Sequence, residues 1–194
     1  MELVGVLDAP AQMTMRERLL LFALVMARRP TRVLEIGTCD GGSALIMRRA
    51  LEASARLVSV DPMPRWSAEV RDALGPNTML VTTASPDGVA EAAALASGPF
   101  DFVLIDGDHT ADGVETDIVA VVPHLADGAV LVFHDAHYWR VREGIERGLR
   151  NDARLVDAGM VSVEETPQGT MEEGQPVIWG GLRLLRYGSG GQPS

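Results

Sequence analysis

The sequence lacks lysine, has a single cysteine, and contains no apolar run long enough to cross a bilayer. One cysteine, Cys39, excludes an internal disulfide framework and cannot build a cysteine metal cluster, which fits a reducing cytoplasm. The longest apolar run near the start, residues 19–27, is far shorter than the roughly 20 residues of a membrane span, and charged residues precede it. We expect a helix that packs on a core, rather than a signal peptide.

Concentrated positive charge is also absent. All 17 cationic side chains are arginine, they form no long run, and the formal net charge is -10. Such a chain has no basic patch that would bind phosphate backbones or anionic lipid. The composition therefore argues against nucleic acid and membranes as partners and predicts a cytoplasmic protein.

Strand and helix patterns alternate along most of the chain. Thr14 and Glu17 have capping-box spacing at the start of the first predicted helix, which Pro30 stops. The predicted strands are 32–36, 56–60, 78–82, 100–105 and 129–133, and the predicted helices are 14–29, 43–53, 68–74, 89–96, 114–123 and 141–150. This alternation predicts an α/β fold, with a Rossmann-like, doubly wound, mostly parallel seven-stranded sheet.

The end of the chain breaks the alternation. Residues 155–163 and 181–187 have strand patterns with only a polar loop, around 167–176, between them, so we expect a closing antiparallel hairpin. Residues 1–187 would then form one domain. The tail 188–194 has too little apolar content to order itself and is predicted to be disordered.

Polar residues gather where the predicted strands end. In an open α/β sheet, ligands bind beyond the carboxyl ends of the strands, near the point where the strand order reverses. Four of the five clusters at these ends contain carboxylates, which favours a functional site. The clusters are Glu35-Ile-Gly37, Asp61, Ser85, Asp106-Gly-Asp-His109 and His134-Asp135.

The first cluster opens a glycine-rich loop, Glu35-Ile-Gly-Thr-Cys-Asp-Gly-Gly-Ser43. Gly37 would allow a tight turn, and Gly41 and Gly42 would let a ligand approach the backbone at a helix N-terminus. The spacing is not the dinucleotide fingerprint. Asp61 is placed to accept the hydroxyls of a ribose. The alternative is that the glycines serve only the turn and that Asp61 caps a helix.

Four motifs in register resemble the class I S-adenosylmethionine (SAM)-dependent methyltransferases, and within them the small O-methyltransferases. The resemblance spans residues 31–150, and its motifs are Val33-Leu-Glu-Ile-Gly-Thr-x-x-Gly-Gly-Ser43, Val58-Ser-Val-Asp61, Phe100-Asp-Phe-Val-Leu-Ile-Asp-Gly-Asp-His109 and Val130-Leu-Val-Phe-His-Asp135. It implies SAM held by the first loop, with the ribose on Asp61 and the adenine beside Ala84-Ser85. The cofactor residues expected from loop and resemblance together are Glu35, Gly37, Thr38, Gly41, Gly42, Ser43, Asp61, Ser85 and Asp106. Trp66 would either stack on the cofactor or belong to the core.

The acidic strand ends predict a metal. Asp106 and Asp135 should end neighbouring strands, so their carboxylates can converge on a divalent cation such as Mg²⁺. The cation would lower the pKa of an acceptor hydroxyl and hold it in line with the methyl group. The related catechol-type enzymes have an asparagine after the second aspartate, where this chain has Ala136. His137 is the expected third ligand, with Asp108 as the alternative.

A histidine is the expected general base. The catechol-type pattern has lysine three residues after the first aspartate, and this chain has His109 there. A histidine titrating near roughly 6.5 can deprotonate a hydroxyl at neutral pH. The alternative is that His109 caps the next helix. His134 either takes part in catalysis or orients Asp135.

The leading hypothesis is a SAM-dependent methyltransferase that modifies a hydroxyl of a small molecule with a divalent metal and a histidine base. The alternatives are a metal-independent N- or C-methyltransferase, a nucleotide-binding protein without transfer activity, and an NAD-type oxidoreductase on a similar fold. Tyr138 and Trp139 would line the acceptor site or contribute, with helix 19–27, to a homodimer.

Overall fold

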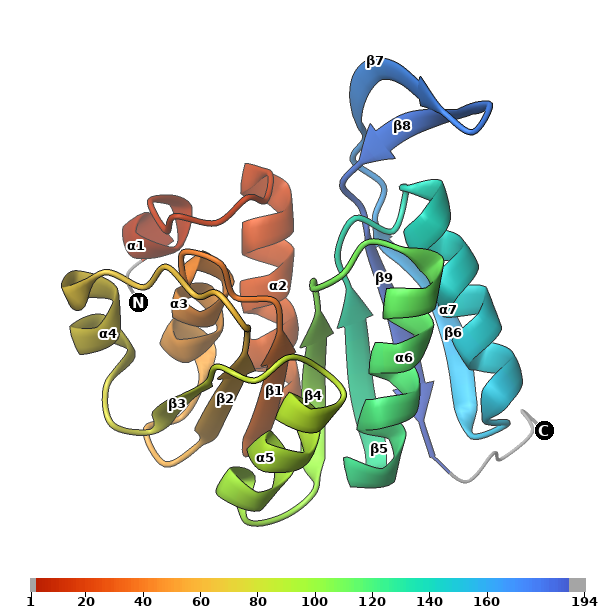
Figure 1. Cartoon of the computed structure of the whole chain (residues 1–194). Helices are drawn as coiled ribbons and strands as arrows, with labels where there is room; N and C mark the ends of the chain where they lie inside the picture. Colours follow the sequence, from red (N-terminus) through yellow and green to blue (C-terminus); the bar gives the residue numbers. More distant parts are fainter. Residues whose placement is uncertain (1–2, 189–194) are drawn as a thin grey trace.

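The computed structural model describes residues 3–188, and their main feature is one seven-stranded sheet (Figure 1). The strand order is β3-β2-β1-β4-β5-β9-β6. β1 to β5 pair in parallel, whereas β9 is antiparallel to both β5 and β6. The strands are β1 (Arg32–Ile36), β2 (Arg56–Val60), β3 (Thr78–Val81), β4 (Phe100–Ile105), β5 (Leu125–Phe133), β6 (Leu155–Ser162) and β9 (Leu182–Tyr187). The predicted doubly wound, mostly parallel sheet is confirmed.

Helices cover both faces of the sheet because side chains along each central strand alternate between two apolar cores. In β4, Phe102 and Leu104 face one core while Val103 and Ile105 face the other. The first core is closed by α1 (Leu3–Leu7), α2 (Met15–Arg28), α3 (Gly42–Ala50) and α4 (Ala68–Leu74). The second core is closed by α5 (Asp87–Ala96), α6 (Ala111–Val121) and α7 (Trp139–Asn151).

The predicted start of the long first helix is correct, and it matters for the site. Thr14 caps α2 and forms a capping box with Glu17, whose carboxylate accepts the Thr14 backbone N–H at 2.9 Å. The helix closes on Arg29 in the left-handed conformation, just before Pro30. β5 begins at Leu125 rather than at residue 129, directly after the 3-10 turn η1 (Val122–His124).

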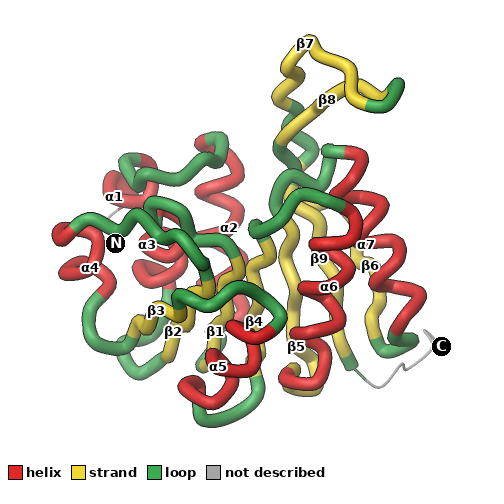
Figure 2. Tube along the Cα trace, viewed as in Figure 1, coloured by secondary structure: helices red, strands yellow, loops and turns green. Residues whose placement is uncertain are grey.

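The segment predicted as a polar loop is a second, two-stranded sheet. β7 (Thr166–Glu172) and β8 (Gln175–Trp179) pair in antiparallel fashion, which corrects the prediction of a loop at 167–176. Their two-residue turn, Glu173-Gly174, has φ of 50° and 78°, as in a tight hairpin turn. This β7–β8 hairpin projects from the sheet at the end where β4 and β5 finish (Figure 2). The predicted antiparallel pairing of 155–163 with 181–187 is confirmed as β6 and β9.

Gly188 closes the described chain, and its backbone N–H donates to the Arg154 carbonyl at 3.1 Å. The rest of the tail that was predicted to be disordered, 189–194, lies outside the described residues. Within 3–188, no helix combines the length and the apolar character needed to cross a membrane.

Candidate active site

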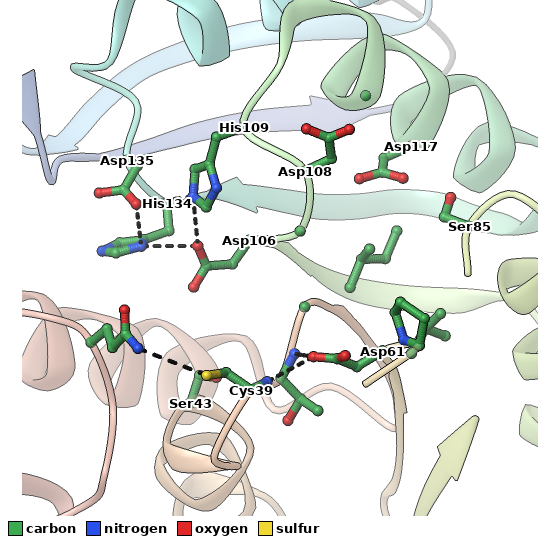
Figure 3. A pocket seen from close by; sticks show the side chains of 18 of the residues that line it. Cys39, Ser43, Asp61, Ser85, Asp106, Asp108, His109, Asp117, His134 and Asp135 are labelled. Carbon is green, nitrogen blue, oxygen red and sulfur yellow. Dashed lines mark hydrogen bonds and ion pairs between the residues drawn. The ribbon is translucent and has the colours of Figure 1, made fainter. Parts of the chain in front are cut away.

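A cavity of about 780 Å³ lies beyond the carboxyl ends of β1, β2, β4 and β5 (Figure 3). β1 and β4 are the central strands at which the strand order reverses, so the cavity lies where α/β proteins bind ligands. The predicted site residues in its lining are Gly37, Thr38, Gly42, Ser43, Asp61, Ser85, Asp106, His109, His134 and Asp135. Three others, Glu35, Gly41 and His137, are not among its lining residues.

Gly37 lets the loops after β1 and β4 approach each other. Its φ is +83°, and a Cβ at this position would lie 2.0 Å from the Asp106 carbonyl oxygen. The Asp106 N–H donates to Ile36 O at 2.8 Å, which fixes the two loops together. Only glycine is compatible with this conformation and this contact.

Gly41 and Gly42 serve packing within the protein. A Cβ on Gly42 would lie 2.2 Å from the Ala11 backbone nitrogen, and one on Gly41 would lie 2.7 Å from Val70. A side chain at either position would therefore collide with the segment before α2 or with α4, while Gly42 still lines the cavity. Trp66 is a core residue, 8% exposed, and its Nε1–H donates to Thr38 Oγ1 at 3.1 Å.

Asp61 organises the glycine-rich loop. Its Oδ2 accepts the backbone N–H groups of Thr38 at 3.0 Å and Cys39 at 2.8 Å, and its Oδ1 accepts that of Met63 at 2.8 Å. Oδ2 thus already accepts two donors, whereas Oδ1 accepts one and has capacity for another. Asp61 thus fixes the loop and still presents acceptor capacity to the cavity, which it lines.

Glu35 lies beneath the loop, fully buried. It accepts hydrogen bonds from the hydroxyls of Ser43 and Ser59, so its carboxyl group ties α3 and β2 to β1. Burial raises the pKa of Glu35 to about 7, although the two serine hydroxyls oppose the shift. The resemblance places Glu35 near the methionine end of the cofactor; in the structure it lies outside the lining of the cavity and supports the loop from beneath.

Glu35 should make the protein less stable as the pH rises. The folded protein keeps the Glu35 proton up to about pH 7, while the unfolded chain releases it near 4.5, so ionisation favours unfolding between these values. From about pH 5 to about pH 8, this group should remove ~2 to 3 kcal/mol of the free energy of unfolding. Glu35→Gln should abolish that loss in urea unfolding at the two pH values. Glu52→Gln, at an exposed position, is the control; equal pH profiles for wild type and Glu35→Gln would refute the expectation.

Two aspartates and two histidines form a cluster at the ends of β4 and β5, which are neighbours as predicted. His134 Nδ1 is 3.0 Å from Asp106 Oδ1 and 3.4 Å from Asp135 Oδ2, and His109 Nε2 is 3.1 Å from Asp135 Oδ2. Asp106, His134 and Asp135 each offer a possible metal-ligand atom, and these atoms lie within 4.8 Å of one another. Figure 3 shows the four side chains converging.

The charges in this cluster stabilise one another. Burial by itself would raise the pKa of Asp106, but His134 and His109 outweigh it and lower that pKa to about 2. Burial would lower the pKa of His109, yet hydrogen bonds and charges from Asp106 and Asp135 raise it to about 9. His134, 4% exposed, likewise has a pKa well above its usual value. The two carboxylates thus favour the protonated form of both histidines, and the pKa of His109 is about 9 instead of the expected value of roughly 6.5.

Glu17 and the start of β9 support the cluster, and sequence reasoning missed both. Glu17 is 1% exposed; its Oε1 accepts the Gly181 N–H at 2.6 Å, and its Oε2 lies 3.5 Å from His134 Nε2. Asp135, in the left-handed conformation, accepts the Gly180 N–H through Oδ1 at 2.6 Å. The sequence shows Glu17 as part of a capping box. It does not show the hydrogen bond from Gly181 to Glu17, because the two residues are far apart in the chain.

A second hollow of about 300 Å³ adjoins the cluster beneath the β7–β8 hairpin. Its lining shares His134 and Asp135 with the large cavity and adds Trp179 of β8. The Trp179 ring packs edge-on against His109, with 5.3 Å between ring centroids. Trp179 was not singled out from the sequence, because its segment was expected to be a loop.

Several predicted residues lie away from the cluster. His137 is next to Gly181, with Nδ1 3.9 Å from Glu165, and the candidate ligand set has His134 in place of His137. Asp108 accepts the Thr110 N–H at 2.8 Å, and Thr110 itself caps α6, so His109 is not the helix cap. Tyr138 is 5% exposed and packs against Trp179. Neither Tyr138 nor Trp139 lines the cavities.

Known proteins match both the sequence and the fold. A 3'-O-methyltransferase from Streptomyces olivaceus, named for 8-demethyl-8-(2-methoxy-alpha-L-rhamnosyl)-tetracenomycin C, is 29% identical over 118 residues, which are 57% of this chain and 29% of that protein. This chain therefore spans less than a third of the length of that curated relative.

Among solved structures, an O-methyltransferase from Bacillus cereus in complex with S-adenosylhomocysteine (SAH) has a TM-score of 0.66 at 18% identity, covering 95% of this chain and 90% of that one. MycE, a methyltransferase of the mycinamycin biosynthetic pathway solved with Mg, SAH and mycinamycin VI, has a TM-score of 0.57 at 20% identity, covering 89% of this chain and 50% of that one. These likenesses show a shared fold.

The family match covers the strands and loops that build the site. A model of the family described as "Methyltransferase domain" matches residues 34–136, more than half of the chain. The matched stretch includes the glycine-rich loop, Asp61, Asp106, His109 and Asp135. With this match and the class I fold around its cavity, the chain belongs to the methyltransferase-domain family.

Proposed function

We propose that the protein transfers the methyl group of SAM to a hydroxyl of a small molecule, with a divalent cation held by Asp106, His134 and Asp135 and with His109 as the general base. The observation that carries this proposal is the position of the cluster. It lies between a cavity of about 780 Å³, large enough for a nucleotide-sized cofactor, and a hollow of about 300 Å³ that would take the acceptor.

The large cavity suits SAM. Asp61 would accept the ribose hydroxyls, Gly37 and Thr38 would face the methionine part, and Ser85 would lie beside the adenine. The sulfonium carbon would then point toward the cluster. Methyl transfer is a direct displacement, in which the acceptor oxygen forms a bond to the methyl carbon as the bond from carbon to sulfur breaks. No protein nucleophile is needed, which leaves Cys39 without a chemical role.

The cluster also suits a divalent cation. Two carboxylates and one imidazole make a mixed oxygen and nitrogen donor set, which Mg²⁺ accepts and Mn²⁺ or Fe²⁺ accepts more readily. Asp106, His134 and Asp135 would hold the ion, while Glu17 would keep His134 in place from behind. When bound, the cation would lower the pKa of the acceptor hydroxyl and orient it.

His109 would take the acceptor proton at Nε2. The negative charges of Asp106 and Asp135 raise the pKa of His109 to about 9, and neutralising them would remove the main cause of that shift. A neutral imidazole would then be available in the large cavity, beside the Trp179 ring that lines the acceptor hollow. Trp179, packed edge-on against the ring, would keep it facing the acceptor.

The acceptor class is a hydroxylated small molecule, and a sugar hydroxyl is the first to test. The Streptomyces relative is named for methylation at the 3' position of a rhamnosyl compound, and the MycE structure holds mycinamycin VI. The acceptor hollow is lined by Thr166, Trp179 and backbone near Gly180. A tryptophan with neighbouring polar groups suits the apolar face and the hydroxyls of a sugar.

Calorimetry and an activity assay test this function. Titration with SAM, SAH and NAD should show binding of the first two and little binding of NAD. Transfer of the labelled methyl group to rhamnosylated or other hydroxylated acceptors should stop in EDTA and return with Mg²⁺ or Mn²⁺. Preferential NAD binding would replace this proposal with an oxidoreductase. Full transfer in EDTA would eliminate the metal-assisted mechanism, and transfer to amine or carbon acceptors alone would support the metal-independent N- or C-methyltransferase instead.

A further inference from the structure

The end of the large cavity farthest from the cluster contains a buried carboxylate that the proposed reaction does not use. Asp117 belongs to α6, lines the cavity, and is only 4% exposed. Figure 3 shows it beside Ser85, away from His109 and Asp135. Burying a carboxylate to this extent costs free energy of folding unless a hydrogen-bond donor or a cation pairs with it.

Within residues 3–188, Asp117 Oδ2 and Ser85 Oγ make no hydrogen bond of good geometry, although Ser85 lies close enough to Asp117 to oppose the rise of its pKa. Buried polar atoms are nearly always hydrogen-bonded in folded proteins, so two orphaned atoms facing one cavity indicate a ligand. Gly107 leaves room at this point, because a Cβ there would lie 3.3 Å from Asp117 Oδ2. The nearby lining includes Val60 and Pro62, whose apolar surfaces suit a flat ring.

On this basis we propose that Asp117, with Ser85, recognises the 6-amino edge of the adenine of the cofactor. The inference rests on the proposed use of SAM and adds a specificity-determining residue to it. Asp117 would accept a hydrogen bond from the adenine N6 amino group, and the Ser85 hydroxyl would donate to the adjacent ring nitrogen. The two side chains together match a base edge that presents a donor beside an acceptor.

The same geometry discriminates against a 6-oxo base. In S-inosylhomocysteine, a carbonyl oxygen replaces the amino group and the neighbouring ring nitrogen carries a hydrogen. The Asp117 carboxylate would then face an acceptor, whereas the Ser85 hydroxyl can donate or accept and would tolerate either base. The discrimination therefore rests on Asp117. Burial raises the pKa of Asp117 to about 6, so the group is mainly an acceptor at neutral pH. A site built to hydrogen-bond one group rejects an analogue that lacks it.

Isothermal titration of SAH and S-inosylhomocysteine against wild type, Asp117→Asn and Asp117→Ala tests the proposal. A hydrogen bond to a charged group corresponds to a change in Kd of about 10-fold to 100-fold. Asp117→Ala should raise the Kd of SAH by that factor and change the Kd of S-inosylhomocysteine by less than about 3-fold. Glu115→Gln, on the same helix but outside the lining of the cavity, should leave both affinities unchanged.

The outcomes separate this proposal from the proposed function. If wild type binds SAH and Asp117→Ala alters neither its affinity nor the preference for adenine, the adenine contact is wrong and SAM use stands. If wild type binds neither compound, SAM use and the adenine contact both fall. Should Asp117→Ala fail to fold, as judged by circular dichroism, Asp117→Asn decides. Its amide can turn its nitrogen toward a 6-oxo group, so it should lower the preference for adenine at least about 5-fold.

Discussion

Replacing Gly37 by alanine is expected to destabilise the protein by more than about 4 kcal/mol, a large share of the stability of a typical domain. The added methyl group would lie 2.0 Å from the Asp106 carbonyl oxygen, and φ at this position is +83°. Backbone, rather than a flexible side chain, would have to move. Because that backbone carries Asp106, any protein that still folds should also bind SAH and Mn²⁺ more weakly.

Gly75 provides the matched control for this substitution. Its φ is +69°, but no atom lies within 4 Å of the position of its Cβ. Gly75, with φ of 69° and ψ of -178°, lies in a region that glycine alone readily adopts, so Gly75→Ala introduces backbone strain without the collision and should cost about 1 to 3 kcal/mol. Urea unfolding of both variants measures the difference. If Gly37→Ala is no more destabilising than Gly75→Ala, the close approach of the loops after β1 and β4 has no energetic importance.

Asp135→Asn is expected to weaken Mn²⁺ binding by at least about 100-fold and methyl transfer by at least about 10³-fold. Asparagine tolerates the left-handed conformation of residue 135, where φ is 53°, so the fold should persist. Its amide oxygen can accept the Gly180 N–H as the aspartate does, which leaves the amide nitrogen facing the cation site. Calorimetry with Mn²⁺ alone reports on the metal separately from turnover.

The two residues first considered as the third ligand supply the controls. Asp108→Asn and His137→Ala should each keep the Mn²⁺ affinity within about 3-fold of wild type, because neither side chain belongs to the cluster of candidate ligands. His134→Ala should behave like Asp135→Asn. Strong loss of Mn²⁺ binding in His137→Ala, with His134→Ala unaffected, would reverse the assignment of the imidazole ligand.

The parallel sheet and the position of the site could be predicted from the sequence, because both depend on local patterns. Apolar segments such as 100–105 are readable as buried strands, and a residue that directly follows such a strand, as Asp106 does, must lie at the carboxyl edge of the sheet. The family motifs then added the cofactor. Each of these inferences needs only neighbouring residues.

The rest depends on contacts between distant segments. Glu17 reads as a helix cap, and only the folded chain shows that it also holds Gly181 and lies beside His134. Asp117 lies within a helix pattern, where a carboxylate is normally solvated. The β7–β8 hairpin was missed because its turn, Glu173-Gly174, is an uncommon pair for a tight turn and because its strands are mostly exposed and polar.

Gly180 and Gly181, which join the β7–β8 hairpin to β9, connect the proposed acceptor hollow to the charged cluster. Gly180 and Gly181 are bound through their amides to Asp135 and to Glu17, so the root of the hairpin and the charged residues share one rigid connection. A ligand that displaces the hairpin would also displace the carboxylates of Asp135 and Glu17. Under the proposed function, binding of the acceptor would therefore be coupled to the alignment of the reacting groups, and a poorly fitting molecule would displace the side chains needed to modify it.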